Sequence, residues 1–138
     1  MDLESYRKVF ADNFGRLLGC EMTAISSEKC VYLFHAKEEH WNPNGVVHGG
    51  ALFAAMDSCQ GAFVHFILDL KKEFGTTAEA SMRFKKPHRL GPVTITTTLR
   101  DRKRNIMFVQ TVAENERGET VALVSEKWMV LPRSRHAD

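Results

Sequence analysis

The apolar positions of the chain repeat first with a helical period and later with a strand period. Over residues 1–19 they fall three and four apart, which predicts a short amphipathic helix closed by Gly19. Residues 20–36 alternate in two pieces around a polar turn, which predicts one long or bent strand. A turn-rich segment then leads into a long apolar helix, which we expect to run from Gly49 to about residue 72 and to end near Gly75.

Beyond this helix the sequence becomes rich in Thr, Val and Ile, and it predicts four strands. Their expected ranges are 77–85, 93–100, 105–114 and 120–131. Short turn-bearing connections favour antiparallel meander pairing of these strands. The pattern is typical of an α+β domain in which a curved antiparallel sheet wraps around one long central helix. We expect a single domain over residues 1–138, with a frayed tail at 132–138.

Composition narrows the class of protein. The 138 residues are 43% hydrophobic and 26% charged, with a net charge of +2, which fits a soluble globular domain better than a general nucleic-acid binder. The three cysteines show neither C-x-x-C spacing nor a partnering His cluster, so we expect no disulfide framework and no metal site. No signal-peptide pattern is visible, and polar residues dilute the apolar segment 46–68 too much for a membrane span. A cytoplasmic protein is expected.

The long helix carries one carboxylate, Asp57, away from the centre of its main apolar face. Its helical neighbours are Phe53, Ala54, Gly61 and Val64, which form a small and apolar stripe. An ionised carboxylate in such a stripe is unfavourable unless another group pairs with it. Three interpretations stay open at this point: a solvated surface Asp, a structural Asp hydrogen-bonded to a neighbouring element, and a functional carboxylate in a pocket or at an interface.

The residues before Asp57 offer a second candidate function. Gly49 and Gly50 begin the helix, where backbone N–H groups lack intrahelical partners and can stabilise a carbonyl oxygen that develops negative charge. The pair is also what a tight turn requires. His48 can cap the helix or fill space, and Asn42 can be a turn residue before Pro43.

The spacing between these groups predicts an assembly. Asp57 follows Gly49 by eight residues, a rise of about 12 Å along a helix, which is too far for both to act on one carbon atom. In a two-fold pair with antiparallel helices, Asp57 of one chain reaches the Gly49 end of the other. The sequence therefore predicts a homodimer with shared sites.

Taken together, Asn42, Gly45, His48, Gly49, Gly50 and Asp57 form the pattern N-x-x-G-x-x-H-G-G-x-x-x-x-x-x-D. The pattern resembles the hotdog-fold acyl-CoA thioesterases of the phenylacetic-acid-degradation type. This resemblance implies Asp57 as nucleophile or general base, the Gly49 amide as the group that polarises the thioester carbonyl, and Asn42 as the group that holds the water or the thioester. It also implies a supporting role for His48, and Thr77, with Thr76 as the alternative, for positioning water. Paired dimers, and so a homotetramer, are a further implication.

Basic residues gather after the helix. Between positions 83 and 104 there are eight, against a single acid. They are Arg83, Lys85, Lys86, Arg89, Arg100, Arg102, Lys103 and Arg104. A solvated charged face is one interpretation, and a site for the phosphates of coenzyme A is the other. No nucleic-acid-binding motif accompanies them.

The sequence thus predicts an acyl-CoA thioesterase that needs no metal and no cofactor, since coenzyme A is part of the substrate. Gly50 and Phe53 join the expected substrate contacts, although Phe53 also suits an ordinary core. The alternatives are a non-catalytic acyl-CoA-binding hotdog module and a hotdog hydratase, whose acid–base pair is not evident in the sequence.

Overall fold

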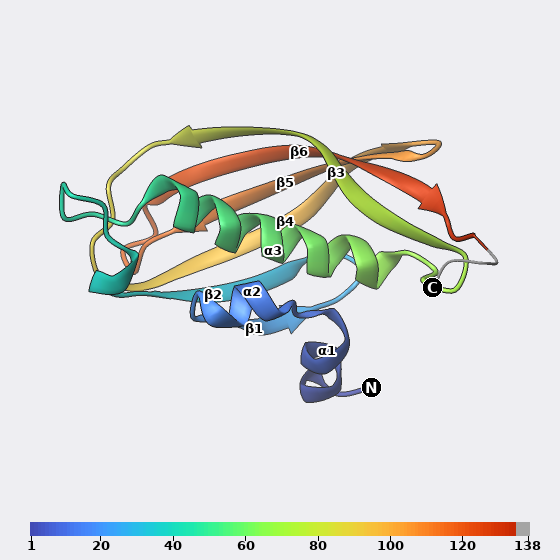
Figure 1. Cartoon of the computed structure of the whole chain (residues 1–138), viewed down its shortest axis with the longest axis horizontal. Coiled ribbons are helices and arrows are strands. Elements are labelled where there is room, and N and C mark those ends of the chain that lie inside the picture. Colours follow the sequence, from blue (N-terminus) through green and yellow to red (C-terminus); the bar gives the residue numbers. More distant parts are fainter. Residues whose placement is uncertain (135–138) are drawn as a thin grey trace.

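The computed structural model describes residues 1–134 of the 138. Its elements in chain order are α1 (Leu3–Phe10), α2 (Asn13–Leu17), β1 (Cys20–Ile25), β2 (Cys30–Ala36), a 3-10 turn η1 (Glu38–His40), α3 (Gly49–Ile67), β3 (Glu73–Phe84), β4 (Gly91–Lys103), β5 (Ile106–Glu114) and β6 (Thr120–Pro132). The strands form one curved antiparallel sheet, α3 lies along its concave face, and α1 and α2 lie on the side of β1 and β2 (Figure 1). The expected architecture is confirmed.

The order of strands in the sheet differs from the expected meander. The order is β1-β2-β4-β5-β6-β3, so β4, β5 and β6 form a meander while β3 pairs with β6 at the far edge. The connection 85–90 therefore crosses the end of the sheet past two strands. That is about 14 Å at a spacing of about 4.8 Å, within reach of six extended residues at about 3.3 Å each. Residues 85–90 do not close a hairpin between β3 and β4, so the meander prediction is wrong for β3.

Helix α3 is buried because it is apolar nearly all round, and its core residues pack between the helix and the sheet. Met56, Cys59 and Phe63 of α3 have no exposed surface, and neither have Phe34 of β2 and Ile95 of β4. Within residues 1–134 no helix is long and apolar enough to cross a membrane.

The helix ends at Ile67, about five residues earlier than predicted. Leu68 turns to an extended conformation and is itself buried in the core, and Asp69 then forms a turn in which its side chain accepts the Lys71 N–H at 3.2 Å. Gly75 is not the helix stop that we expected. It lies in β3, where a Cβ atom would come within 2.7 Å of Val64, so glycine there permits the close approach of strand and helix.

The N-terminal region is also more divided than predicted. Two helices replace the single one because Asp12 accepts the Gly15 N–H at 2.9 Å and starts α2. Residues 20–36 form a hairpin, closed by a 2.8 Å hydrogen bond from Ser26 N–H to the Lys29 carbonyl, instead of one bent strand.

The start of the expected frayed tail is held in place. Pro132 belongs to β6, and the Arg133 N–H donates to the Lys72 carbonyl at 2.8 Å. The remainder of that tail, 135–138, lies outside the described residues.

Candidate active site

Asp57 lies on the side of α3 that faces the edge strand β3. It is half-buried, and the Thr77 hydroxyl donates to its Oδ1 at 3.3 Å. Thr77 faces the helix because it pairs with Trp128 of β6, which is buried against the core, and the register of β3 shifts only after Thr77. Thr76 pairs with Met129 and points to the opposite face of the sheet, so the structure brings Thr77, and not Thr76, to Asp57.

A second carboxyl lies beside Asp57 that the sequence analysis missed. Glu126 of β6 is 2% exposed. Its pKa is raised from 4.5 to about 9, first by burial and then by the adjacent Asp57 carboxyl, while the Thr77 hydroxyl acts in the opposite direction. Glu126 alternates with Val124 and Trp128 along β6, and all three are buried. This alternation is the signal in the sequence by which Glu126 could have been recognised as facing inward.

The N-terminus of α3 presents an open backbone donor. No acceptor for the Gly49 N–H is found among residues 1–134. His48 caps the helix, since its Nδ1 accepts the Gly50 N–H at 2.8 Å, so the His48 ring and the Gly50 amide are occupied with each other. Gly49 is therefore the amide of this pair that is available to a ligand.

Asn42 shapes the loop in front of this donor. Its Oδ1 accepts the Asn44 N–H at 2.9 Å, and its backbone N–H donates to the Val46 carbonyl at 2.9 Å. The Asn42 Nδ2 amide donates to none of the described residues. The side chain thus holds the loop with one end and keeps two donor hydrogens for a ligand at the other.

The two candidate groups open into separate hollows of the chain. Asn42 and Gly49 line a cleft of about 410 Å³ with Phe84, Lys85 and Lys86. The second hollow, of about 220 Å³, is lined by Asp57 with Phe10, Asp12, Ser58, Gly61, Ala62, His65 and Trp128. No residue is common to both hollows, so one chain does not bring Asp57 and Gly49 to the same reacting atom.

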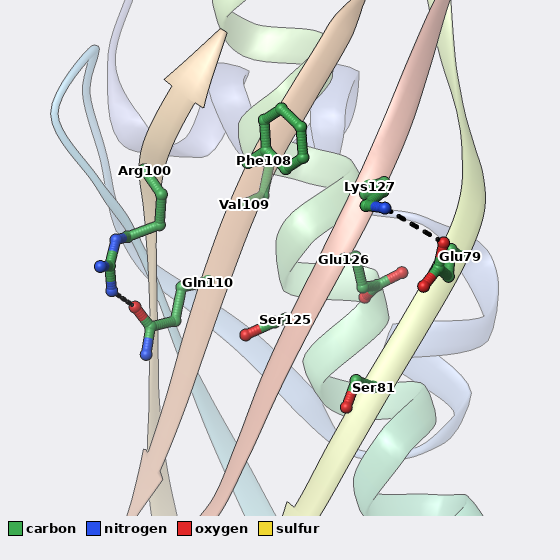
Figure 2. Close-up of a pocket in the computed structure, with 9 residues that line it drawn as sticks. All are labelled: Glu79, Ser81, Arg100, Phe108, Val109, Gln110, Ser125, Glu126 and Lys127. Carbon is green, nitrogen blue, oxygen red and sulfur yellow. Dashed lines mark hydrogen bonds and ion pairs between the residues drawn. The ribbon is translucent and has the colours of Figure 1, made fainter.

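A third hollow, of about 360 Å³, lies on the outer face of the sheet (Figure 2). Lys127 and Glu79 form a 3.3 Å ion pair there, and Arg100 hydrogen-bonds to Gln110 across β4 and β5. Neither Asp57 nor Gly49 lines it, so it is not the candidate active site.

The basic residues do not form one patch. Lys85, Lys86 and Arg89 lie in the connection between β3 and β4, close to the Gly49 cleft, and Arg83 is exposed on β3 just before them. Arg102, Lys103 and Arg104 lie at the other end of β4, which has 13 residues and so spans about 40 Å. The expectation of a single cluster from 83 to 104 is therefore wrong within one chain. Neighbours in sequence are separated because the strand between them is long.

The remaining expected contacts are less distinctive. Phe53 is half-buried against the core and lines neither the Gly49 cleft nor the Asp57 hollow. In the described part of the chain no three His, Cys, Asp or Glu side chains gather as a metal site requires.

Comparison with known proteins identifies the fold. The chain superposes on a variant of thioesterase PA1618 from Pseudomonas aeruginosa with a TM-score of 0.88, at 20% identity over 96% of each chain. Thioesterase HI1161 from Haemophilus influenzae matches with a TM-score of 0.89, at 20% identity over 99% of this chain and 96% of that one. The PaaI protein from the phenylacetic acid degradation operon of Escherichia coli matches with 0.81, at 18% identity over 92% and 90%. These likenesses confirm the hotdog fold.

Sequence comparison extends this to the family. A candidate esterase of Saccharolobus solfataricus, SSO1253, is 26% identical over 113 residues, which are 82% of this chain and 74% of that protein. The model of the Thioesterase superfamily matches residues 44–122, more than half of the sequence and a range that includes Gly49, Asp57 and Thr77. The chain therefore belongs to the thioesterase superfamily and is a thioester hydrolase with the hotdog fold.

Proposed function

We propose that this thioester hydrolase acts on acyl-CoA, with Asp57 and the Gly49 N–H as the two halves of its catalytic site. The observation that carries the proposal is the open Gly49 N–H at the start of α3, beside the Asn42 amide in a cleft of about 410 Å³. A thioester carbonyl bound there has its oxygen at the positive end of the helix dipole. The acyl carbon then becomes the electrophile for attack.

Asp57 supplies the attack in one of two ways. As a nucleophile its carboxylate adds to the acyl carbon, coenzyme A leaves as the thiolate, and water hydrolyses the resulting anhydride. As a general base it removes a proton from the water that attacks, and that proton later reaches the departing thiolate. Thr77 orients the carboxylate in both, and neither route uses a metal or a further cofactor.

The catalytic site in this proposal is shared by two chains. The separate hollows of Asp57 and Gly49 support it, as does the edge position of β3, whose residues 76–81 are all exposed. A second copy that extends the sheet along β3, with antiparallel α3 helices, brings Asp57 of one chain to the Gly49 end of its partner. We propose this homodimer as the active unit and a homotetramer as its paired form.

The phosphates of coenzyme A are assigned to Lys85, Lys86 and Arg89. These residues line the Gly49 cleft and the surface that adjoins it, where the Arg89 guanidinium lies 4.9 Å from the centre of the Trp41 ring. Lys and Arg donors suit phosphate oxygens. The acyl group then points along the helices toward Asp57.

A pair of substitutions at one position tests the oxyanion donor. Gly49→Pro removes the N–H at the first helical position, where proline fits, and His48 before it already has the extended conformation (φ −59, ψ 133) that proline requires. Gly49→Ala adds the same Cβ beside the Phe84 ring but keeps the N–H. Over a panel of aliphatic, aromatic and hydroxylated acyl-CoAs, Gly49→Pro should lower kcat by about 100- to 1,000-fold, and Gly49→Ala by far less. Equal losses would remove the proposed role of the amide.

Mixing inactive chains tests the shared site. Asp57→Asn and Gly49→Pro chains, each inactive alone, regain one intact site in each mixed dimer. Random association should therefore restore about a quarter of the wild-type activity. A mixture that stays inactive although mixed dimers form would show that each site lies within one chain.

A further inference from the structure

Glu126 is a buried acid whose carboxyl oxygens lack ordinary partners. Neither its Oε1 nor its Oε2 has a hydrogen-bond partner among the described residues, and the residue is 2% exposed. Its sequence neighbours Ser125 and Lys127 are exposed on the outer face of the sheet, whereas Glu126 lies between β6 and β3 with α3 behind it (Figure 2). A carboxylate held there without a donor is strongly unfavourable, so a proton must accompany it.

The groups that face Glu126 determine which atoms its proton can contact. Asp57 of α3 is the charged neighbour, and the Thr77 hydroxyl of β3 is the neutral one. The cross-strand partners are Ala80 on β3 and Val109 on β5, and neither titrates.

The other titratable groups of the packed elements are turned away or engaged elsewhere. Glu79 of β3 and Lys127 of β6 pair with each other on the outer face of the sheet. His65, further along α3, has its ring at 2.8 Å from the Gly61 carbonyl and accepts the Gly75 N–H at 3.3 Å. Asp12, which lines the same hollow as Asp57, accepts the Ser58 hydroxyl and the Gly15 N–H, each at 2.9 Å. Among the described residues Asp57 is therefore the acid that lies beside Glu126.

We propose that Glu126 is a positioning residue of the catalytic site: in its protonated form it donates a hydrogen bond to the Asp57 carboxylate and fixes the orientation in which Asp57 acts. The inference rests on the proposed catalytic role of Asp57. Thr77 already donates to Oδ1 of Asp57. With the Glu126 hydroxyl as a second donor, the carboxylate is held from two sides, and its remaining lone pairs point toward the reacting water or acyl carbon.

Loss of the Glu126 proton reverses this support. The O–H donor disappears and a second negative charge appears next to Asp57, so the pair repels and the orientation is lost. Because burial raises the pKa of Glu126 to about 9, the activity of the wild type should fall above that pH. A purely structural role of Glu126 would not produce this loss of activity at alkaline pH.

Three variants at two positions test the proposal through pH profiles of kcat on the best acyl-CoA from pH 5 to 10. Glu126→Leu removes the donor and should lower kcat by about 10- to 100-fold throughout. Glu126→Gln has an N–H that can donate and does not titrate, so it should restore most of this loss and remain active above pH 9. Glu21→Gln, the same change at an exposed position of β1 on the opposite edge of the sheet, should match the wild type, including its alkaline decline. The proposal is overturned if Glu126→Leu is as active as the wild type, or if Glu126→Gln declines at the same pH.

Unfolding measurements separate this inference from the proposed function. Between 4.5 and about 9 the folded chain keeps the Glu126 proton and the unfolded chain loses it, so stability falls as pH rises. From pH 6 to pH 8, at fixed protein concentration, the unfolding constant of the wild type relative to Glu126→Gln should therefore rise by about 100-fold. No difference in slope would show that Glu126 is ionised and would sink the inference, whatever Asp57 does. Full turnover by Asp57→Asn would instead remove the proposed function, even with the slope intact.

Discussion

The Thr77 hydroxyl donates to the Oδ1 of Asp57 at 3.3 Å and so ties the central helix to the free edge of the sheet. The two residues are brought together by the pairing of β3 with β6, in which Thr77 lies opposite the buried Trp128 and so faces α3. The edge strand that we propose as the dimer contact therefore also carries a residue of the catalytic site, and pairing of two chains and orientation of Asp57 depend on the same segment.

Removal of this hydroxyl should weaken catalysis without preventing folding. A hydrogen bond to a charged group contributes about 1.5 to 3 kcal/mol, so Thr77→Ala should lower kcat by about 10- to 100-fold, and Thr77→Ser should keep most of the activity. Thr76→Ala is the matched control, because Thr76 is exposed and pairs with Met129 away from Asp57. Steady-state kinetics on one acyl-CoA would decide, and equal effects at positions 76 and 77 would contradict the assignment.

Local sequence signals identified the elements of this fold. The features that they missed depend on contacts between segments far apart in the sequence. Glycine, turn residues and alternation placed the strands within a few residues, and helical spacing singled out Asp57. The helix end was predicted too late because Leu68 is buried as an extended residue, so apolar character continued past the last helical turn.

The pairing of β3 with β6 and the separation of the basic residues depend on where the chain crosses the sheet, which no local pattern encodes. Glu126 was missed for another reason. It stands at an inward position of a clear alternation, but a charged residue in a strand next to Lys127 reads as part of a solvated face. Glu126 becomes a candidate site residue only because it lies next to Asp57 in the folded chain.

The two ends of the Asn42 side chain can be tested separately. Asn42→Asp keeps the Oδ1 acceptor that holds the Asn44 N–H, but it replaces the Nδ2 donors by an oxygen. We expect the melting temperature to change little and kcat/KM to fall by about 10- to 100-fold, because the thioester or water loses a donor. Asn42→Ala should lose both stability and activity. Thermal unfolding and kinetics on the same samples would check this, and full activity in Asn42→Asp would exclude the amide from the mechanism.

A buried polar pair behind the active site should contribute strongly to stability. Trp128 Nε1 donates to Gln60 Oε1 at 2.8 Å, and Gln60 Nε2 donates to the Val109 carbonyl at 3.3 Å. Gln60→Leu leaves the indole N–H and the carbonyl without partners and should lower the free energy of unfolding by roughly 2 to 4 kcal/mol.

A double-mutant cycle isolates the contact between these two side chains. In Gln60→Leu/Trp128→Phe the indole donor that Gln60→Leu leaves without a partner is absent. The double variant should therefore lose less free energy of unfolding than the two single variants together, with a coupling of about 1 to 2 kcal/mol. Urea unfolding at fixed protein concentration measures each corner of the cycle. Strict additivity would mean that the hydrogen bond adds nothing to stability.

The separated basic groups give a charge-matched test of where coenzyme A binds. Lys85→Ala/Lys86→Ala/Arg89→Ala removes the three positive charges near the Gly49 cleft, and Arg102→Ala/Lys103→Ala/Arg104→Ala removes three at the far end of β4. Because Lys and Arg attract phosphate oxygens, the first triple variant should raise KM for acyl-CoA by about 10- to 100-fold and weaken its dependence on salt, with kcat little changed. The second should resemble the wild type.

A substrate without phosphates completes this test. With an acyl-pantetheine thioester, which lacks the nucleotide and its phosphates, the first triple variant and the wild type should have similar KM values, because the removed charges then have no substrate phosphate to bind. Should the far triplet raise KM for acyl-CoA instead, the nucleotide would bind at the other end of β4. The assignment to Lys85, Lys86 and Arg89 would then be wrong.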